Sequence, residues 1–340
     1  MLKYSIKRST QWLCATLGPH TRAPSQPTLL ILMYHRILPL DDERARLEEP
    51  GMIVTPSTFR AHLGYIKNYF QPVQLEDWGN ICTNGRNRPG LSCAITFDDG
   101  WADNYEYAFP ILQEFDMPAT IFLVTDMIGT RNIFWPEMLA RTLFSLVDAP
   151  KDYRNNPAIL WLQALLPTNI RDFHRCPDTE ELSSIINRAK SFTDEEIHQN
   201  LSAIISAHEL EISPDKQSLL DWDQVLEMTE SGLINIASHT RKHIRLGTST
   251  PDSILADEII GSKVVIEKMT GLKVNSFCFP NGDYSPQALK LVKENYRYAV
   301  TTRSGWNTCG SDPHLLQRVA IHEDIAHDRT AFLSRISGWL

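Results

Sequence analysis

Apolar runs of strand length recur along the chain, and stretches with helical spacing separate several of them. Such runs cover residues 29–34, 94–97 and 118–124, with few polar interruptions. They are typical of strands that are buried on both faces of a parallel sheet. Apolar residues at helical spacing over 101–115 predict a helix between the second run and the third. This β-α-β order predicts a parallel sheet with right-handed crossovers.

The same rhythm resumes in the second half of the chain. A helix is expected over 221–231, and strands and helices alternate after it. The expected strands are 233–238, 274–279, 298–301 and 315–321, and the expected helices are 250–269, 285–294 and a last one that ends at Leu340. In the first half of the chain, a further helix is expected over 59–69. The pattern as a whole predicts an α/β fold.

Residues from about 130 to 220 interrupt the rhythm. They contain no convincing strand, and their helical segments are 134–147, 179–190 and 194–207. We interpret this stretch as a helical insertion. Two roles stay open for it: a lid or substrate-shaping subdomain, or a second structural layer with no part in binding.

The first residues combine positive charge with a short apolar piece. Lys3, Lys7 and Arg8 precede residues 11–17, in which polar side chains interrupt the apolar ones. This piece makes a poor export signal, and no stretch reaches the 18 apolar residues of a membrane-spanning helix. We expect a packed or frayed helix, while a peripheral contact with an anionic membrane surface stays open. The expected location is the cytoplasm, with membrane association as the alternative.

Proline and glycine mark the end of this tail. They cluster in residues 18–28, which are typical of a linker. We therefore expect a tail and linker over 1–28. A single α/β domain is expected over 29–340, interrupted at about 130–220.

The composition is that of an ordinary globular protein, with 42% hydrophobic and 22% charged residues among 340. The net charge of −8 argues against nucleic acid as a partner, because phosphate binding needs a concentrated basic face. The six cysteines are irregularly spaced and form no CxxC pair. We expect neither a disulfide framework nor a zinc knuckle, and a reducing compartment is favoured. Nothing in the sequence indicates the oligomeric state.

Two adjacent carboxylates, Asp98 and Asp99, follow the expected strand 94–97 directly. Side chains alternate along a strand, so both acids can serve one site only if the backbone turns there, and Gly100 permits that turn. The carboxyl ends of parallel strands are where such folds keep their chemistry. One acid can hold a metal while the other accepts a proton. A solvated turn is the structural alternative.

Histidines also stand at strand ends. His239 follows the strand 233–238, and His243 lies four residues later, on the same side if the segment forms one helical turn. Imidazole nitrogen is a frequent ligand of zinc and similar ions, and Asp99 is the natural third ligand. His35 ends the first apolar run and is either a satisfied hydrogen bonder or a site group.

Two motifs taken together, Thr96–Gly100 (TFDDG) and His239-Thr240-x-x-His243, resemble the polysaccharide deacetylase family. This family is also called the NodB-homology domain or carbohydrate esterase family 4. The likeness extends over about residues 29–325 without the insertion. It implies a distorted (β/α) barrel of about seven parallel strands, here with a helical insertion. It also implies removal of N-acetyl groups from amino sugars with one divalent metal, most often Zn²⁺, with Co²⁺ and Ni²⁺ as alternatives.

The resemblance implies roles for the matching residues. Asp98 would be the general base, and Asp99 would bind the metal with His239 and His243. Residues 32–35 resemble the first strand of members whose sequence order is permuted, and this implies that His35 is the general acid. Residues 277–282 (FCFPNG) resemble a motif that lines the substrate groove. The expected substrate contacts are Tyr34, Trp101, Pro280 and Asn281.

The sequence departs from the family pattern in two places. Many members carry an arginine that orients the base at the start of the groove motif, where this chain is apolar, and Arg318 is the candidate replacement. The late histidine that serves as acid in many members has no clean counterpart. His314 and His322 lie near that place, and we rank both below His35.

The resemblance thus implies metal-assisted amide hydrolysis, with an N-acetylated glycan as the partner and acetate as a product. A backbone N–H near Tyr34 or Asn281 would help hold the oxyanion. Two alternatives stay open. One is a sugar O-acetyl esterase on the same metal site, and the other is an inactive carbohydrate-binding homologue.

Overall fold

Two compact units make up the chain. The computed structural model describes residues 2–49, 51–83, 90–147, 157–167, 173, 175–214 and 217–339. The first unit comprises Met1–Pro39, Ile53–Thr130 and Leu219–Leu340, and the second comprises Leu40–Met52 and Arg131–Ser218.

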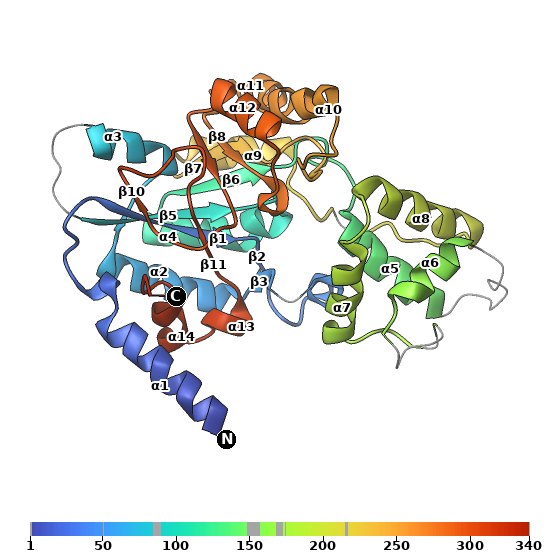
Figure 1. The fold of residues 1–340 in the computed structure, drawn as a ribbon, viewed down its shortest axis with the longest axis horizontal. Helices are drawn as coiled ribbons and strands as arrows, with labels where there is room; N and C mark the ends of the chain where they lie inside the picture. The colour runs from blue at the N-terminus through green and yellow to red at the C-terminus, as the bar shows by residue number, and fades with distance from the viewer. Residues whose placement is uncertain are drawn as a thin grey trace. The chain divides into compact units, whose positions relative to one another are not determined.

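A curled, mostly parallel sheet forms the centre of the first unit (Figure 1). Its main path runs β10-β1-β5-β6-β7-β8-β9, β11 pairs in parallel with β1, and β4 pairs with β5. Only the pairing of β10 with β1 is antiparallel among the described strands of this sheet. The strands are β1 (Thr28–Tyr34), β4 (Gln71–Pro72), β5 (Leu91–Phe97), β6 (Ala119–Leu123), β7 (Ile234–Ser238), β8 (Ser276–Cys278), β9 (Tyr298–Val300), β10 (Asn307–Thr308) and β11 (Val319–Ala320). The expected distorted (β/α) barrel is confirmed.

Helices cover the outer face of the sheet. In Figure 1, α11 and α12 lie above it, and α2 and α14 lie below it. Several of these helices begin at an N-cap residue. Ahead of α2, for example, the Thr55 side chain accepts a hydrogen bond from Thr58 N. The helices of this unit are α1 (Leu2–Leu17), α2 (Pro56–Tyr69), α3 (Trp78–Thr83), α4 (Phe109–Phe115), α9 (Trp222–Glu230), α10 (Asp252–Ala256), α11 (Ser262–Thr270), α12 (Pro286–Asn295), α13 (Glu323–Ala326) and α14 (Arg329–Arg335).

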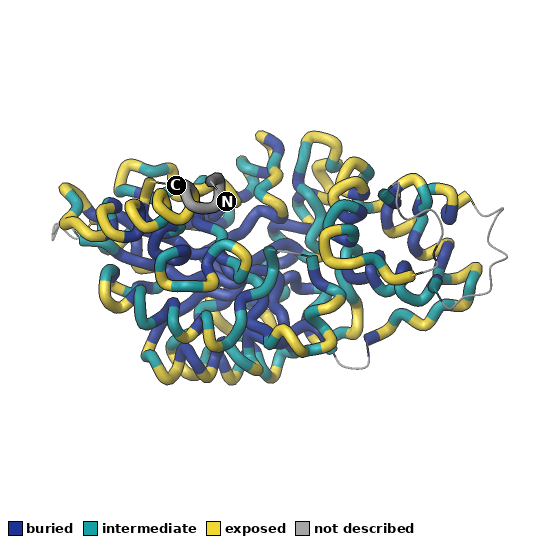
Figure 2. Tube along the Cα trace, turned by 90° about the horizontal axis from the view of Figure 1, so that it is seen from below, coloured by how far each residue is buried: buried dark blue, intermediate teal, exposed yellow. Residues whose placement is uncertain are grey.

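β1 and β6 are buried along their whole length, as their apolar runs predict. Figure 2 shows that buried residues fill the interior of the trace. In β1, Leu30 and Leu32 join the large core beneath the helices. Leu29 and Ile31, which alternate with them, join a smaller core. That smaller core takes side chains from the other strands too, among them Ala94, Phe122, Ala237, Cys278 and Val300. The interior of the curled sheet is therefore packed, and chemistry is left to its rim.

The second unit is helical and has a hydrophobic core of its own. It consists of α5 (Trp135–Val147), α6 (Pro157–Leu165), α7 (Thr179–Ala189) and α8 (Asp194–Ala207), with a 3-10 turn at Glu43–Leu47. Capping boxes begin α7 at Asp178 and α8 at Thr193. Residues 40–52, which lie far from the insertion in sequence, belong to the same unit. A role for this unit in binding stays a prediction.

Helix α1 occupies most of the expected tail and packs against α14. Its Trp12, Leu13 and Leu17 side chains are exposed. Among the described residues, no helix combines the length and apolarity needed to cross a membrane. The peripheral membrane contact stays a prediction.

A disulfide joins Cys82 of α3 to Cys309, next to β10. This corrects the expectation drawn from cysteine spacing. The two residues are 227 positions apart, so the fold alone brings them together. Of the remaining cysteines, Cys14, Cys93 and Cys278 are buried as free thiols, and Cys176 is exposed.

His62 of α2 is a buried histidine that the fold keeps neutral. Its Nε2 lies 2.8 Å from the carbonyl oxygen of Ala326 and its Nδ1 lies 3.1 Å from the hydroxyl of Tyr34, so Nε2 donates and Nδ1 accepts. Burial lowers the pKa of His62 to about 4, although the bond to Ala326 opposes that change. In the unfolded chain the same imidazole binds its proton near pH 6.5.

We predict that His62 makes the free energy of unfolding depend on pH. Between pH 6.5 and about 4, the His62 imidazole is protonated in the unfolded chain but not in the folded chain. The His62 contribution is therefore complete above pH 6.5 and falls, by on the order of 3 kcal/mol, as the pH approaches 4. In urea unfolding, the free energy of unfolding should fall less between pH 7.5 and pH 5 for His62→Gln than for the wild type. The exposed His327 provides the control His327→Gln. An equal loss in His62→Gln and in the wild type would contradict the prediction.

Candidate active site

The sheet brings the sequence-predicted residues to one edge. His35 follows β1, Asp98 follows β5 and His239 follows β7. β1 pairs with β5, β5 with β6 and β6 with β7, all in parallel, so the carboxyl ends of these strands share an edge. This edge is where the chemistry was expected.

A tight backbone turn separates the two adjacent carboxylates. Asp99 has φ 76° and Gly100 has φ 81°, both in the left-handed region, and Gly100 N donates to Asp98 O at 3.0 Å. The turn expected at Gly100 therefore begins one residue earlier, at a non-glycine residue, where this conformation is unusual. A Cβ on Gly100 would meet Leu123 and Ile128 at 2.8 and 3.0 Å. The turn sends Asp98 and Asp99 to different partners.

Asp99 meets the two histidines. Its Oδ1 lies 3.4 Å from His239 Nε2 and 3.4 Å from His243 Nε2. The three ligand atoms all lie within 4.8 Å of one another. Burial alone would raise the pKa of Asp99, but the hydrogen bond to His239 and the nearby His243 outweigh it and hold that pKa below its usual range. One carboxylate oxygen and two imidazole nitrogens form a donor set that suits zinc and similar ions.

The tautomer of His239 fits such a role. Its Nδ1 lies 2.8 Å from the carbonyl oxygen of Cys278, a group that only accepts hydrogen bonds. With Nδ1 donating to this carbonyl, Nε2 faces Asp99 and is the nitrogen that would bind a metal ion in place of its proton. Metal-bound histidines are commonly oriented in this way by a backbone carbonyl.

The two histidines meet through a loop rather than through the helical turn expected from their spacing. Thr240 and His243 have φ 69° and 61°, and Thr240 Oγ1 accepts from His243 N. Glu258 holds the middle of the loop, because its Oε2 accepts from Arg241 N at 2.8 Å and Lys242 N at 2.9 Å. Burial raises the pKa of Glu258 although these bonds oppose it. Sequence reasoning missed Glu258, which belongs to no recognisable motif.

Asp98 is clamped by Arg318. The guanidinium donates to Asp98 Oδ1 and Oδ2 at 2.7 Å each, and both side chains are buried. Arg318 also donates to Thr301 O and Thr96 Oγ1. Burial would raise the pKa of Asp98, but the charge and hydrogen bonds of Arg318 lower it below its usual value. Asp98 is therefore ionised at neutral pH, and the pairing suggested for Arg318 is present.

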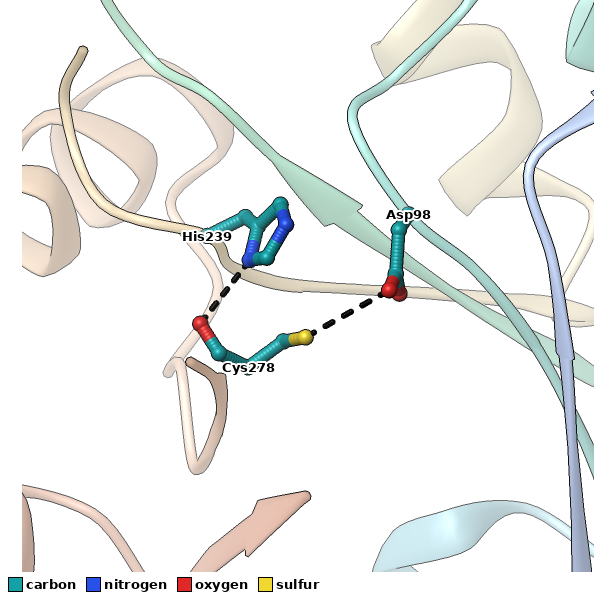
Figure 3. A group of neighbouring side chains, drawn as sticks. All are labelled: Asp98, His239 and Cys278. Atoms are coloured by element: carbon teal, nitrogen blue, oxygen red, sulfur yellow. Dashed lines mark hydrogen bonds between the residues drawn. The ribbon is translucent and has the colours of Figure 1, made fainter. Parts of the chain in front are cut away.

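A second group that could hold a metal shares His239 with the first: Asp98, His239 and Cys278 (Figure 3). The Cys278 Sγ lies 3.5 Å from Asp98 Oδ2 and 3.1 Å from a terminal nitrogen of Arg318. Burial raises the pKa of this thiol, whereas metal binding needs the thiolate. A guanidinium at this place also repels a cation. The set of Asp99, His239 and His243 is the better fit.

His35 lies beside Asp98, with 3.9 Å between its Nε2 and Asp98 Oδ2. Its side chain is 19% exposed, and its carbonyl oxygen accepts from Asn104 Nδ2. His314 is held instead by a bond from its ring to Tyr296 O. The ring of His322 lies 3.2 Å from Asp324. The structure thus places the first-ranked of the three histidines next to the buried carboxylate.

The four expected substrate contacts do not form one exposed surface. Only Asn281 has an exposed side chain. Tyr34 is fully buried with its hydroxyl on His62, and Pro280 is buried as well. Trp101 is 3% exposed, and its Nε1 donates to Asp99 Oδ2 at 3.0 Å. The expected contact between Trp101 and the substrate is therefore corrected, because the structure buries the indole.

We predict that replacing both Asp98 and Arg318 lowers the free energy of unfolding less than the two single replacements would if their effects added. Arg318→Met leaves a buried carboxylate unpaired and should cost on the order of 3–5 kcal/mol. Adding Asp98→Asn should recover part of that loss in a double-mutant cycle measured by urea unfolding. The exposed pair of Arg8 and Asp328, at 2.8 Å, is the control, and Arg8→Met should cost at most about 1 kcal/mol. Strictly additive losses at Asp98 and Arg318 would contradict the prediction.

Comparison with known proteins adds to this geometry. A family model described as polysaccharide deacetylase matches residues 85–151 and 188–299, slightly more than half of the chain. The matched ranges contain Asp98, Asp99, His239 and His243 and exclude Arg318.

Two relatives illustrate the similarity in sequence. The chain is 24% identical over 296 residues to YxkH of Bacillus subtilis, which carries a polysaccharide deacetylase assignment, covering 86% of this chain and 71% of the relative. It is 31% identical over 120 residues to a poly-beta-1,6-N-acetyl-D-glucosamine N-deacetylase of Staphylococcus epidermidis. That alignment covers 33% of this chain and 41% of the relative.

Two solved structures share the fold. A polysaccharide deacetylase from Bacillus cereus has a TM-score of 0.58 at 21% identity, covering 92% of this chain and 69% of the other. A Streptococcus pyogenes deacetylase in complex with acetate has a TM-score of 0.58 at 18% identity, covering 91% and 98%.

Proposed function

This chain belongs to the polysaccharide deacetylase family, and from that premise we propose that it is a metal-dependent N-deacetylase of an N-acetylated glycan. The observation that carries the proposal is that two adjacent carboxylates at the end of β5 face different partners. Asp99 faces two imidazoles, whereas Asp98 faces a guanidinium. A metal ligand and a base are thus one residue apart.

Asp99 Oδ1, His239 Nε2 and His243 Nε2 would hold one divalent cation. Two nitrogens and one oxygen favour Zn²⁺, with Co²⁺ and Ni²⁺ as alternatives. Three protein ligands leave a position open for water or substrate. When bound, such an ion polarises a carbonyl and makes water more acidic.

Asp98 would accept the proton of the attacking water. Arg318 keeps this carboxylate ionised and fixes its plane, so Asp98 Oδ2 is ready to take a proton at neutral pH. The base therefore needs no large reorientation before the reaction.

His35 would return a proton to the departing nitrogen. Its Nε2 lies 3.9 Å from Asp98 Oδ2 and its side chain is partly exposed, so it borders both the base and the solvent. Water adds to the amide carbon, the C–N bond breaks, and the amine leaves with a proton from His35. The products are acetate and a free amino sugar.

We propose N-acetylglucosamine in a glycan chain as the substrate class. The support is the 31% identity over 120 residues with a relative named as a poly-beta-1,6-N-acetyl-D-glucosamine N-deacetylase. A lipid-linked or oligomeric form of the same sugar would present the same amide to the site.

We predict that metal binding and turnover separate between two variants. Asp98→Asn should retain the metal and lose at least about 100-fold in acetate release from N-acetylglucosamine oligomers, because it removes the base. His239→Ala should lose the metal itself. Metal content is measured by mass spectrometry after dialysis, and acetate release is measured with and without chelator. Full activity of Asp98→Asn would defeat the assignment of the base, and wild-type metal content of His239→Ala would defeat the ligand set.

Two further samples sharpen this experiment. His35→Ala is compared with His314→Ala, and only the first should impair turnover if His35 is the acid. O-acetylated sugars replace the N-acetylated oligomers in a parallel assay. Faster release from the O-acetylated sugars would identify a sugar O-acetyl esterase instead.

A further inference from the structure

A buried assembly of three side chains lies behind Asp99 and serves none of the steps above: Trp101, Arg36 and Asp103. The indole Nε1 of Trp101 donates to Asp99 Oδ2 at 3.0 Å. The other oxygen, Oδ1, is the one that lies 3.4 Å from each histidine nitrogen. The two oxygens of Asp99 are thereby assigned to different partners.

Arg36 fixes the indole. Its guanidinium carbon lies 4.1 Å from the centre of the Trp101 ring, in cation–π contact. Its Nε and one terminal nitrogen each lie 2.9 Å from Asp103 Oδ2. Asp103 Oδ1 in turn accepts from Ile37 N at 2.8 Å. Arg36 is 2% exposed and Asp103 is fully buried, so this ion pair has been taken out of water.

The same segments hold the backbone of His35. Asn104, next to Asp103, donates from Nδ2 to His35 O at 2.8 Å. Residues that follow Asp99 thus fasten residues 35–37, which follow β1. A buried ion pair is seldom more stable than well-packed apolar side chains, so its presence behind a charged site points to a geometric task.

We infer that Trp101, held by Arg36 and Asp103, is a positioning residue that sets which oxygen of Asp99 faces the metal. The inference rests on the metal site of the proposed function and goes beyond it. The terminal torsion of a carboxylate is broad, so an Asp99 without a donor on Oδ2 can rotate and offer either oxygen or both. The Trp101 N–H occupies Oδ2 and leaves Oδ1 to the cation. Trp101 itself is buried, so this role would be exerted through Asp99.

The experiment measures metal binding of the full chain rather than turnover. The chain is stripped of metal and titrated with Zn²⁺ against a chromophoric chelator. Co²⁺ is then added, and its visible spectrum reports the ligand geometry. Trp101→Phe keeps a ring and removes the donor. Trp306→Phe is the matched control, because the buried Nε1 of Trp306 has no hydrogen-bond partner among the described residues.

We expect Trp101→Phe to weaken Zn²⁺ binding by about 10–100-fold, as loss of an outer partner of a metal ligand does elsewhere, and to alter the Co²⁺ spectrum. Trp306→Phe should match the wild type in both. Arg36→Lys keeps the charge but loses the planar fork, and it should shift both readouts in the same direction as Trp101→Phe. If Trp101→Phe does not fold, Arg36→Lys tests the positioning role by itself.

The outcomes separate this inference from the proposed function. If the wild type binds Zn²⁺ and the variants at Trp101 and Arg36 bind it equally well with an unchanged spectrum, the positioning role is overturned and the metal site stands. If the wild type binds no metal at all, the metal site falls and the positioning role falls with it. A purely structural role for Trp101 would lower thermal stability without moving the spectrum.

Discussion

The site depends on one backbone turn, in which Asp99 and Gly100 both adopt left-handed conformations. A strand that continued straight would send Asp98 and Asp99 to opposite faces of the sheet. The turn keeps both carboxylates at the rim and points them at different neighbours. Gly100 tolerates this conformation, and packing against Leu123 and Ile128 leaves no room for a side chain there. The two adjacent acids therefore have different partners because of this local geometry.

Electrostatics then distinguishes the two acids. Both are buried, and burial alone would favour their protonated forms. Asp98 is kept charged by a guanidinium that donates to both of its oxygens, and Asp99 is kept charged by the neighbouring imidazoles of His239 and His243. Each carboxylate is therefore ionised for a different reason, and each can have a different task.

Much of the fold was predictable because it rests on local pattern. The apolar runs at 29–34 and 118–124 are strands in the structure, and the curled parallel sheet follows from their alternation with helices. The TFDDG and HTRKH segments were recognisable because the chemistry lies within a few residues. Their joint position at one edge followed from the parallel sheet.

Most of the supporting residues were not predictable, because they or their partners lie in distant parts of the chain. Arg318 reaches Asp98 across 220 positions, and only a gap in a known pattern pointed to it. Glu258 and Asp103 sit in helical stretches where an acid is ordinarily exposed, and only the packed structure shows them buried. Trp101 was misjudged for the same reason: its place two residues after Asp99 suggested a residue of the site rim, but the structure buries its side chain.

The bridge between Cys82 and Cys309 closes a covalent ring over 227 positions of the chain. A loop of that size removes about 5 kcal/mol of conformational freedom from the unfolded ensemble, if the link acts through chain entropy. That amount is comparable to the whole margin by which many domains stay folded. The stability of this protein therefore depends on the thiol–disulfide balance of its surroundings. A preparation kept in strong reductant should have a lower free energy of unfolding than one kept in air.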